Sequence, residues 1–194
     1  MDVGDVLIRT APMAQYRGLA RETSLPWEHV AAVLEDSGIV TGFETGHLAP
    51  AAFTAAVRDH LHRPELHHRQ VRDAWNAVVA DVEPKLATRA RKLAETGRLV
   101  LASNTNPFHW TVVHGRLAAA GINAPAYLSF RIGYLKPAAE FFAELASSEP
   151  RVAEGAVYID DREDNVAEAI GLGMTGCLHR NADSTAAFLD DLPG

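Results

Sequence analysis

The sequence contains a single cysteine, no long apolar run and no block of basic residues. One thiol cannot form an intrachain disulfide, and the N-terminus shows no secretion signal, so we expect a cytoplasmic protein. A membrane-spanning helix needs about 20 apolar residues, and the lack of such a run argues against a membrane protein. The 18 Lys and Arg residues against 25 Asp and Glu give a formal net charge of −7. This acidic balance argues against nucleic acid or an anionic membrane as a partner.

The apolar content of the chain is sufficient for a packed core, since 47% of its 194 residues are hydrophobic. This length favours one domain, or one domain that carries a modest insertion. Over residues 13–82 apolar residues recur at helical spacing behind Pro26, Pro50 and Pro64, which indicates a small helical block. The glycines of the stretch 41–46 predict a loop between two of these helices.

After Pro84 short apolar runs alternate with helical patterns. The sequence predicts helices over 84–96, 107–120, 137–147 and 163–171, and strands near 99–102, 126–130, 156–159 and 175–178. This alternation is typical of an α/β fold with a Rossmann-like, doubly wound parallel sheet covered by helices on both faces. We therefore expect an α/β core made of residues 1–12 and 83–194, with residues 13–82 as a helical insertion. In such sheets ligands bind beyond the carboxyl ends of the strands.

Two acidic residues, Asp160 and Asp161, follow the predicted strand 156–159. Two like charges about 4 Å apart cost roughly 4 kcal/mol at an effective dielectric constant near 20. A divalent cation would remove this cost, and oxygen ligands suit Mg²⁺. The alternative is that one carboxylate caps the next helix while the other points into solvent.

Polar residues also follow the predicted strands 99–102 and 126–130. Ser103 and Asn104 stand just before a helix start, where hydroxyl and N–H groups can bind an anion, although an ordinary polar turn has the same composition. Lys136 could bind a phosphate or balance clustered carboxylates. Taken alone, Lys136 fits a solvated surface lysine better.

Near the N-terminus, Asp2 stands before a glycine turn and an apolar segment, where it could supply a nucleophile and a metal ligand. Only Met1 precedes it, whereas a typical strand has about five or six residues. Either the natural chain starts further upstream, or the centre of the sheet is rebuilt and Asp2 is poorly held.

Four stretches of the chain, in this order, resemble the motifs of the haloacid dehalogenase superfamily. They are Asp2–Leu7, Leu101–Asn106, Gly133–Pro137 and Tyr158–Asn165. In this superfamily a nucleophilic aspartate forms an aspartyl-phosphate with Mg²⁺ present. The resemblance implies that residues 13–82 form the small helical cap that follows the first motif. Within that cap, 44–46 and 74–76 are similar to cap segments of sugar-phosphate phosphatases.

The resemblance implies a role for each acidic residue of the motifs. Asp2 would attack the phosphorus atom. The Mg²⁺ ion would be held by Asp2, Asp161 and the Gly4 carbonyl, with Asp160 close by. Asn165 would contact these ligands and not the ion itself.

The resemblance also implies a phosphate site. Ser103, the Asn104 backbone and Lys136 would neutralise the phosphate oxygens. The protein would then be a phosphatase that acts on a small phosphorylated metabolite such as a sugar phosphate.

One position departs from the pattern of the family phosphatases, which carry a second aspartate two residues after the nucleophile. Here that position is Gly4, and Asp5, one residue out of register, is expected to point elsewhere. General acid–base catalysis contributes about 10²–10⁴-fold, so we expect a slow enzyme or a good leaving group such as an anomeric phosphate. A dehalogenase would be expected to carry an aromatic residue at Gly4.

Two other functions are compatible with parts of the pattern. The chain could be a degenerate relative that binds a ligand or partner without turnover, as the glycine at position 4 suggests. A receiver-like signalling domain also pairs acidic residues with Ser or Thr and Lys, but the helical insertion argues against it. His60, His62, His67 and His68 cluster around Pro64, and because the proline separates them we interpret them as solvated helix ends and not as a zinc site.

Overall fold

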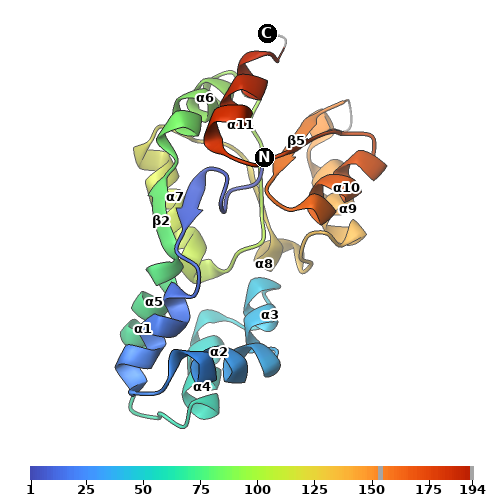
Figure 1. Cartoon of the computed structure of the whole chain (residues 1–194). Helices are drawn as coiled ribbons and strands as arrows, with labels where there is room; N and C mark the ends of the chain where they lie inside the picture. The colour runs from blue at the N-terminus through green and yellow to red at the C-terminus, as the bar shows by residue number, and fades with distance from the viewer. Residues whose placement is uncertain (153–154, 193–194) are drawn as a thin grey trace.

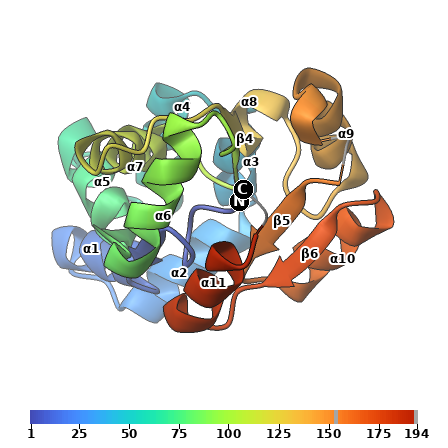
Figure 2. The same cartoon turned by 90° about the horizontal axis from the view of Figure 1, so that it is seen from above.

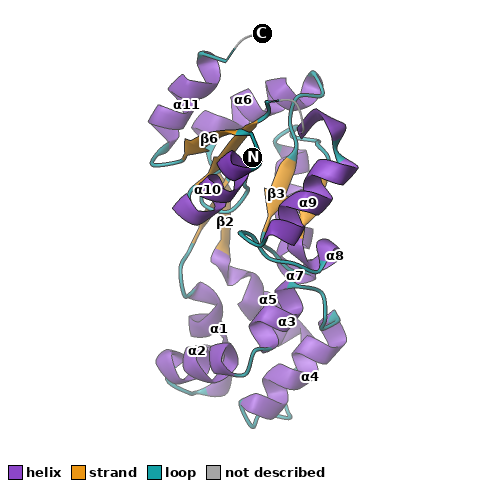
Figure 3. Cartoon of the chain, turned by 90° about the vertical axis from the view of Figure 1, so that its right-hand side faces the viewer, coloured by secondary structure: helices purple, strands orange, loops and turns teal. Residues whose placement is uncertain are grey.

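The structure is a computed structural model and describes residues 1–152 and 155–192. A helical block occupies one end of the molecule, and the strands with their covering helices occupy the other (Figures 1 and 3). Among the described residues, none of the helices combines the length and the apolar character that a bilayer span requires.

The helical block packs around its own apolar cluster, which includes Leu34, Phe53 and Trp75. Its helices are α1 (Ala14–Thr23), α2 (Trp27–Asp36), α3 (Ile39–Glu44), α4 (Pro50–His60) and α5 (His68–Trp75).

Two expectations for this region are wrong. The stretch 41–46 is not a loop throughout, because α3 continues to Glu44 and buries Phe43 and its apolar neighbours in the cluster. The helical pattern does not reach residue 82, because a short 3-10 turn (Asn76–Val78) leads into strand β2 (Val79–Val82). Strand β2 pairs antiparallel with β1 (Ile8–Thr10), and this tertiary pairing decides the conformation of a valine-rich stretch.

The α/β part follows the predicted alternation closely. Its elements are α6 (Pro84–Glu95), β3 (Leu101–Ser103), α7 (Pro107–Ala119), β4 (Ala126–Leu128), α8 (Ser129–Ile132), α9 (Ala139–Ser148), the 3-10 turn Pro150–Val152, β5 (Val157–Asp160), α10 (Glu163–Gly171), β6 (Thr175–Leu178) and α11 (Ala182–Asp190). The short helix α8 and the helix α11 are additional to the prediction.

Two parallel strand pairs, β3–β4 and β5–β6, are joined by the first residues of the chain. The Met1 nitrogen donates to the Val100 carbonyl at 2.8 Å, and Ala102 N–H donates to the Met1 carbonyl at 3.0 Å. On the other side, Asp2 N–H donates to the Ile159 carbonyl at 2.8 Å. The predicted parallel arrangement is therefore confirmed. The idea that Asp2 is poorly held is wrong, because hydrogen bonds fix this segment on both sides.

Alternate strand residues point to opposite faces of the sheet, each covered by helices. Leu101 and Ile159 belong to the apolar cluster shared with α6, α7 and α11. Ala102 and Tyr158 belong to the cluster shared with α9 and α10. Figure 2 shows α9 and α10 on one side of the molecule and α6 and α7 on the other.

The helical block approaches the carboxyl ends of the strands at Gly46. This glycine has φ +75°, and a Cβ added there would lie 2.1 Å from the carbonyl oxygen of Phe130, which belongs to α8 just after β4. Only glycine permits both the left-handed backbone and this approach.

Replacing Gly46 by alanine is expected to lower the free energy of unfolding by about 2–4 kcal/mol, from left-handed strain and from the clash with Phe130. Gly38→Ala is the matched control, because Gly38 has φ +74° but nothing within 4 Å of an added Cβ. Its expected loss is about 1 kcal/mol. Denaturant unfolding of both variants measures the difference, and equal losses would show that the contact with Phe130 does not persist in solution.

Candidate active site

Three carboxylates meet where β5 and the N-terminal segment end. Asp160 is the last residue of β5, Asp161 follows it, and Asp2 lies on the adjacent segment. One oxygen of each carboxylate lies within 4.8 Å of those of the other two. Asp2 and Asp160 are buried, whereas Asp161 is exposed. The structure thus brings together the acidic residues that the sequence singled out.

The Lys136 ammonium lies between two of these carboxylates. Its Nζ is 2.6 Å from Asp2 Oδ1 and 2.7 Å from Asp160 Oδ2, and it donates a third hydrogen bond, of 3.0 Å, to the Ala102 carbonyl. Lys136 is only 4% exposed. The interpretation of this residue as a solvated surface lysine is therefore wrong, because the fold encloses its charge between two anions.

The pKa values of Asp2, Asp160 and Lys136 follow from the burial of these side chains and from the Lys136 charge between the two carboxylates. Burial raises the pKa of Asp2 to about 6, with Asp160 adding to the rise and Lys136 opposing it. Burial would also raise the pKa of Asp160, but Lys136 and the hydrogen-bond donors around this carboxylate outweigh burial and hold its pKa below the usual value. For Lys136 burial acts in the lowering direction, and the two carboxylates reverse it, so that its pKa is raised. The two carboxylates therefore favour the charged form of Lys136.

The Asp160 carboxylate is held by protein donors on both oxygens. Oδ1 accepts from Arg162 N–H at 3.0 Å and from Asn165 Nδ2 at 2.9 Å. Oδ2 accepts from the Tyr158 hydroxyl at 2.8 Å and from Lys136. Asn165 is buried, and its own Oδ1 has no hydrogen-bond partner. Both oxygens of Asp160 therefore already accept hydrogen bonds from the protein, whereas the carboxylates of Asp2 and Asp161 accept fewer.

Asn104 positions the lysine through two hydrogen bonds. Its Nδ2 donates to the Lys136 carbonyl at 2.9 Å, and its Oδ1 accepts from Lys136 N–H at 2.7 Å. Ser103, the last residue of β3, is buried beside it. The Asn104 side chain is therefore engaged with the backbone of Lys136.

Two residues that help to hold the site together were not identified from the sequence. Ser129 follows β4, and its hydroxyl both accepts from Thr105 N–H and donates to the Thr105 carbonyl, each at 2.9 Å, which fixes the loop after Asn104. The strand-end rule did not identify Ser129, because the predicted strand 126–130 included it, whereas β4 ends at Leu128. Tyr158 lies within an apolar run, where no sequence signal marks it.

Asp5 does not replace the missing second aspartate. Its carboxylate accepts from Thr10 N–H at 3.0 Å and from the Thr10 hydroxyl at 2.8 Å. The expectation that Asp5 points elsewhere is confirmed, because these bonds tie it to the start of the link to the helical block. The position two residues after Asp2 has only the backbone of Gly4.

His67, His68 and His109 each contact part of the helical block, whereas His60 and His62 are exposed. His67 caps α5 by accepting from Arg69 N–H, and His68 Nδ1 lies 2.9 Å from the Thr54 hydroxyl. His109, in the first turn of α7, stacks on Trp75 and bonds to its carbonyl at 3.0 Å, and burial lowers its pKa to about 4. His109 therefore joins the first turn of α7 to the helical block as a neutral group.

Comparison with known structures defines the class of fold. A haloacid dehalogenase family enzyme of Bacteroides thetaiotaomicron superposes with a TM-score of 0.83 at 24% identity, over 92% of this chain and 91% of that one. A predicted HAD-like hydrolase of Porphyromonas gingivalis gives a TM-score of 0.83 at 22% identity, over 99% and 96%. The chain therefore has the haloacid dehalogenase fold, and the fold expected from the four motifs is confirmed.

Comparison of sequences adds one partial match. The chain is 33% identical over 86 residues to flavin mononucleotide hydrolase 1, a chloroplast protein of Arabidopsis thaliana. The match covers 44% of this chain and 35% of that protein. No family model matches the chain. The Bacteroides enzyme has also been solved with magnesium and inorganic phosphate, with a TM-score of 0.79 to this chain.

Proposed function

We propose that the protein is a magnesium-dependent phosphatase of the haloacid dehalogenase type, which hydrolyses a small phosphorylated metabolite through an aspartyl-phosphate on Asp2. The observation that carries the proposal is the buried Lys136 ammonium between Asp2 and Asp160, with Asp161 open beside them. In this view residues 13–82 act as the cap, and the strand pair β1–β2 is its connection to the core.

The residues present fit a magnesium ion. Three carboxylates lie within 4.8 Å of one another, and the Lys136 ammonium lies between two of them, which leaves an excess of negative charge for a hard cation. The oxygens of Asp2 and Asp161, with the Gly4 carbonyl, would hold the ion. Asp160, whose oxygens already accept hydrogen bonds from the protein, would lie beside it and orient Lys136. When bound, the ion supplies positive charge against the phosphate oxygens.

The chain's own residues account for the rest of the reaction. A carboxylate oxygen of Asp2 forms a bond to phosphorus while the bond from phosphorus to the ester oxygen breaks, and the leaving oxygen takes a proton from water. A second water then attacks the phosphorus, which releases inorganic phosphate and restores Asp2. Lys136, the Ser103 hydroxyl and the Asn104 backbone compensate the charge on the phosphate oxygens, the main requirement of phosphoryl transfer.

The glycine at position 4 limits the substrates that suit such a site. Because Gly4 carries no acid and Asp5 is bound by Thr10, the leaving group has to depart without a carboxylic acid beside it. We therefore propose a substrate whose leaving group is stable as an anion, such as an anomeric sugar phosphate. The partial match to a flavin mononucleotide hydrolase makes flavin mononucleotide a second substrate to test.

The test is phosphate release from p-nitrophenyl phosphate, a panel of sugar phosphates and flavin mononucleotide, with and without a metal chelator. We expect release with Mg²⁺, its loss on chelation and its recovery when Mg²⁺ is restored. Release that is indifferent to the chelator would contradict the metal-dependent mechanism.

The rival function, a non-catalytic binding protein, predicts a different outcome. Titration calorimetry would then show binding of a phosphate ester without any phosphate release over long incubation. That result would remove catalysis from the proposal and retain the anion site.

A further inference from the structure

The Tyr158 hydroxyl is a buried polar group beside the acidic residues, and the proposed reaction does not use it. Tyr158 lies on β5 two residues before Asp160, so the two side chains point to the same face of the sheet. Tyr158 is only 2% exposed, and its hydroxyl donates to Asp160 Oδ2 at 2.8 Å. Burial and the nearby carboxylates raise the pKa of Tyr158, so the hydroxyl keeps its proton and acts as a donor.

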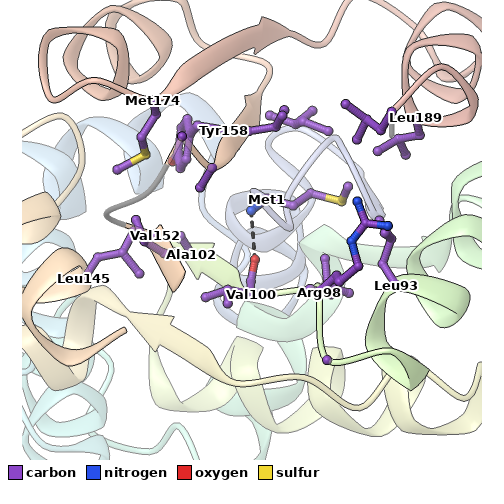
Figure 4. A pocket seen from close by; sticks show the side chains of 17 residues that line it. Met1, Leu93, Arg98, Val100, Ala102, Leu145, Val152, Tyr158, Met174 and Leu189 are labelled. Carbon is purple, nitrogen blue, oxygen red and sulfur yellow. Dashed lines mark hydrogen bonds between the residues drawn. The ribbon is translucent and has the colours of Figure 1, made fainter. Parts of the chain in front are cut away.

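Packing fixes the direction of this hydroxyl. The Tyr158 ring meets the Phe142 ring of α9 edge-on, with the ring centroids 5.3 Å apart. It belongs to an apolar cluster that includes Met174, which lies near it in Figure 4. Lys136 Nζ lies over the same ring, 5.8 Å from its centroid. The ring is therefore held so that its hydroxyl points at Asp160 and not into solvent.

The Asp160 carboxylate has its acceptor sites filled by the protein. An ionised carboxylate has about four lone-pair sites, two on each oxygen. Tyr158 and Lys136 donate to Oδ2. Arg162 N–H and Asn165 Nδ2 donate to Oδ1. A cation could therefore bind to Asp160 only by displacing one of these four donors.

We propose that Tyr158 is a positioning residue that keeps Asp160 out of the coordination of the metal ion, so that Asp160 holds Lys136 instead. This inference rests on the metal site of the proposed function. Asp2, Asp160 and Asp161 each offer an oxygen within 4.8 Å of those of the other two. Without the hydroxyl, Asp160 would have a free acceptor site beside the two carboxylates that hold the ion.

The consequence of this arrangement is a preference among divalent cations. Ca²⁺ takes about six to eight oxygen ligands in flexible geometry, and it accepts additional carboxylates readily. Mg²⁺ is smaller, requires a nearly ideal octahedron and usually keeps several waters. By closing Asp160 to the ion, the Tyr158 hydroxyl therefore favours Mg²⁺ over Ca²⁺.

The test is Tyr158→Phe, which removes the hydroxyl and keeps the ring. Titration calorimetry of the wild type and the variant, with Mg²⁺ alone and with Ca²⁺ alone, gives the ratio of the two Kd values. We expect Ca²⁺ binding to tighten about tenfold relative to Mg²⁺ binding, which is the scale of one hydrogen bond to a charged group. A residue that only filled space would leave this ratio unchanged.

Tyr16→Phe is the matched control. Tyr16 is also a buried tyrosine whose hydroxyl donates to a carboxylate, that of Glu35 in the helical block. This variant is expected to keep the wild-type ratio of cation affinities. Equal changes in Tyr16→Phe and Tyr158→Phe would show that the effect is a general result of losing a buried hydroxyl, and would overturn the inference.

A second variant tests whether the effect passes through Asp160. An amide is a weaker metal ligand than a carboxylate, so the gain in Ca²⁺ affinity is expected to disappear when Tyr158→Phe is combined with Asp160→Asn. An unchanged ratio in Tyr158→Phe, or a gain that persists with Asp160→Asn, would overturn the inference.

Calorimetry also separates this inference from the proposed function. A wild type that binds Mg²⁺ but releases no phosphate from any ester would contradict the phosphatase, whereas the shift in cation preference would still support the role of Tyr158. Magnesium-dependent phosphate release together with an unchanged ratio in Tyr158→Phe would contradict only the role of Tyr158.

Discussion

The Asp2→Asn variant is expected to release phosphate at least about 1,000-fold more slowly than the wild type, a loss of about 4 kcal/mol of transition-state stabilisation. Asparagine keeps the shape of the side chain but is a poor nucleophile and a weak metal ligand. Measurement of kcat with saturating Mg²⁺ on a good substrate checks this.

The same variant is expected to stay folded. Because burial raises the pKa of Asp2 to about 6, the charged form of this carboxylate is unfavourable in the fold, and a neutral amide removes repulsion with Asp160. Asp5→Asn is the matched control, since this exposed acid is bound by Thr10 and lies outside the proposed catalytic machinery. Unchanged kcat in Asp2→Asn would remove Asp2 as the nucleophile.

The Lys136→Met variant is expected to lose both activity and stability. Without the ammonium, Asp2 and Asp160 are left buried without compensation, which costs about 3–5 kcal/mol of the free energy of unfolding near neutral pH. Urea unfolding in the presence of a chelator measures this, because bound metal would mask the loss.

The pH dependence of this loss has a definite sign. Without Lys136, burial raises the pKa of both carboxylates above their unfolded values, so the folded state takes up protons first as the pH falls. The deficit relative to the wild type is then expected to shrink between neutral pH and about pH 4.

Lys85→Met is the matched control for this variant. Lys85 Nζ lies 2.5 Å from Asp183 Oδ1, but the two side chains are 55% and 77% exposed. Exposed pairs contribute little, so this variant is expected to unfold almost like the wild type. Similar losses for Lys85→Met and Lys136→Met would show that burial between Asp2 and Asp160 has no special effect.

The excess of carboxylates over ammonium groups explains why Asp2→Asn and Lys136→Met are expected to differ in stability. Asp2→Asn removes one charge from a group with surplus negative charge, whereas Lys136→Met removes the cation that lies between two of its carboxylates. A protein that kept this arrangement only for stability would gain from an apolar replacement of the whole group. The arrangement therefore favours a function that needs both signs of charge in one place.

The α/β elements were predictable because their signals are local. Pro84 and Pro107 begin α6 and α7, and β6 spans the predicted residues 175–178. The helical block was less predictable. The glycine in α3 suggests a loop, and only burial of Phe43 against neighbouring helices keeps it helical.

The residues of the candidate site also divide into those with a local signal in the sequence and those without one. Asp160, Asp161 and Ser103 were found by the rule that polar residues follow the strands of such a sheet. Lys136 alone fits a surface lysine, and Tyr158 gives no signal, because their roles depend on which strand ends are neighbours.

The sequence by itself determined the short strands, their order along the chain and the polar residues that end them, because these follow from patterns a few residues long. Only the tertiary structure decided that residues 1–3 lie between β3 and β5. The hydrogen bond from Met1 to Val100 joins residues 99 apart, and the ion pair of Lys136 with Asp2 joins residues 134 apart. Contacts over such separations form only when the whole sheet assembles, since their loop-closure entropy is repaid by burial of the core and not by local pattern.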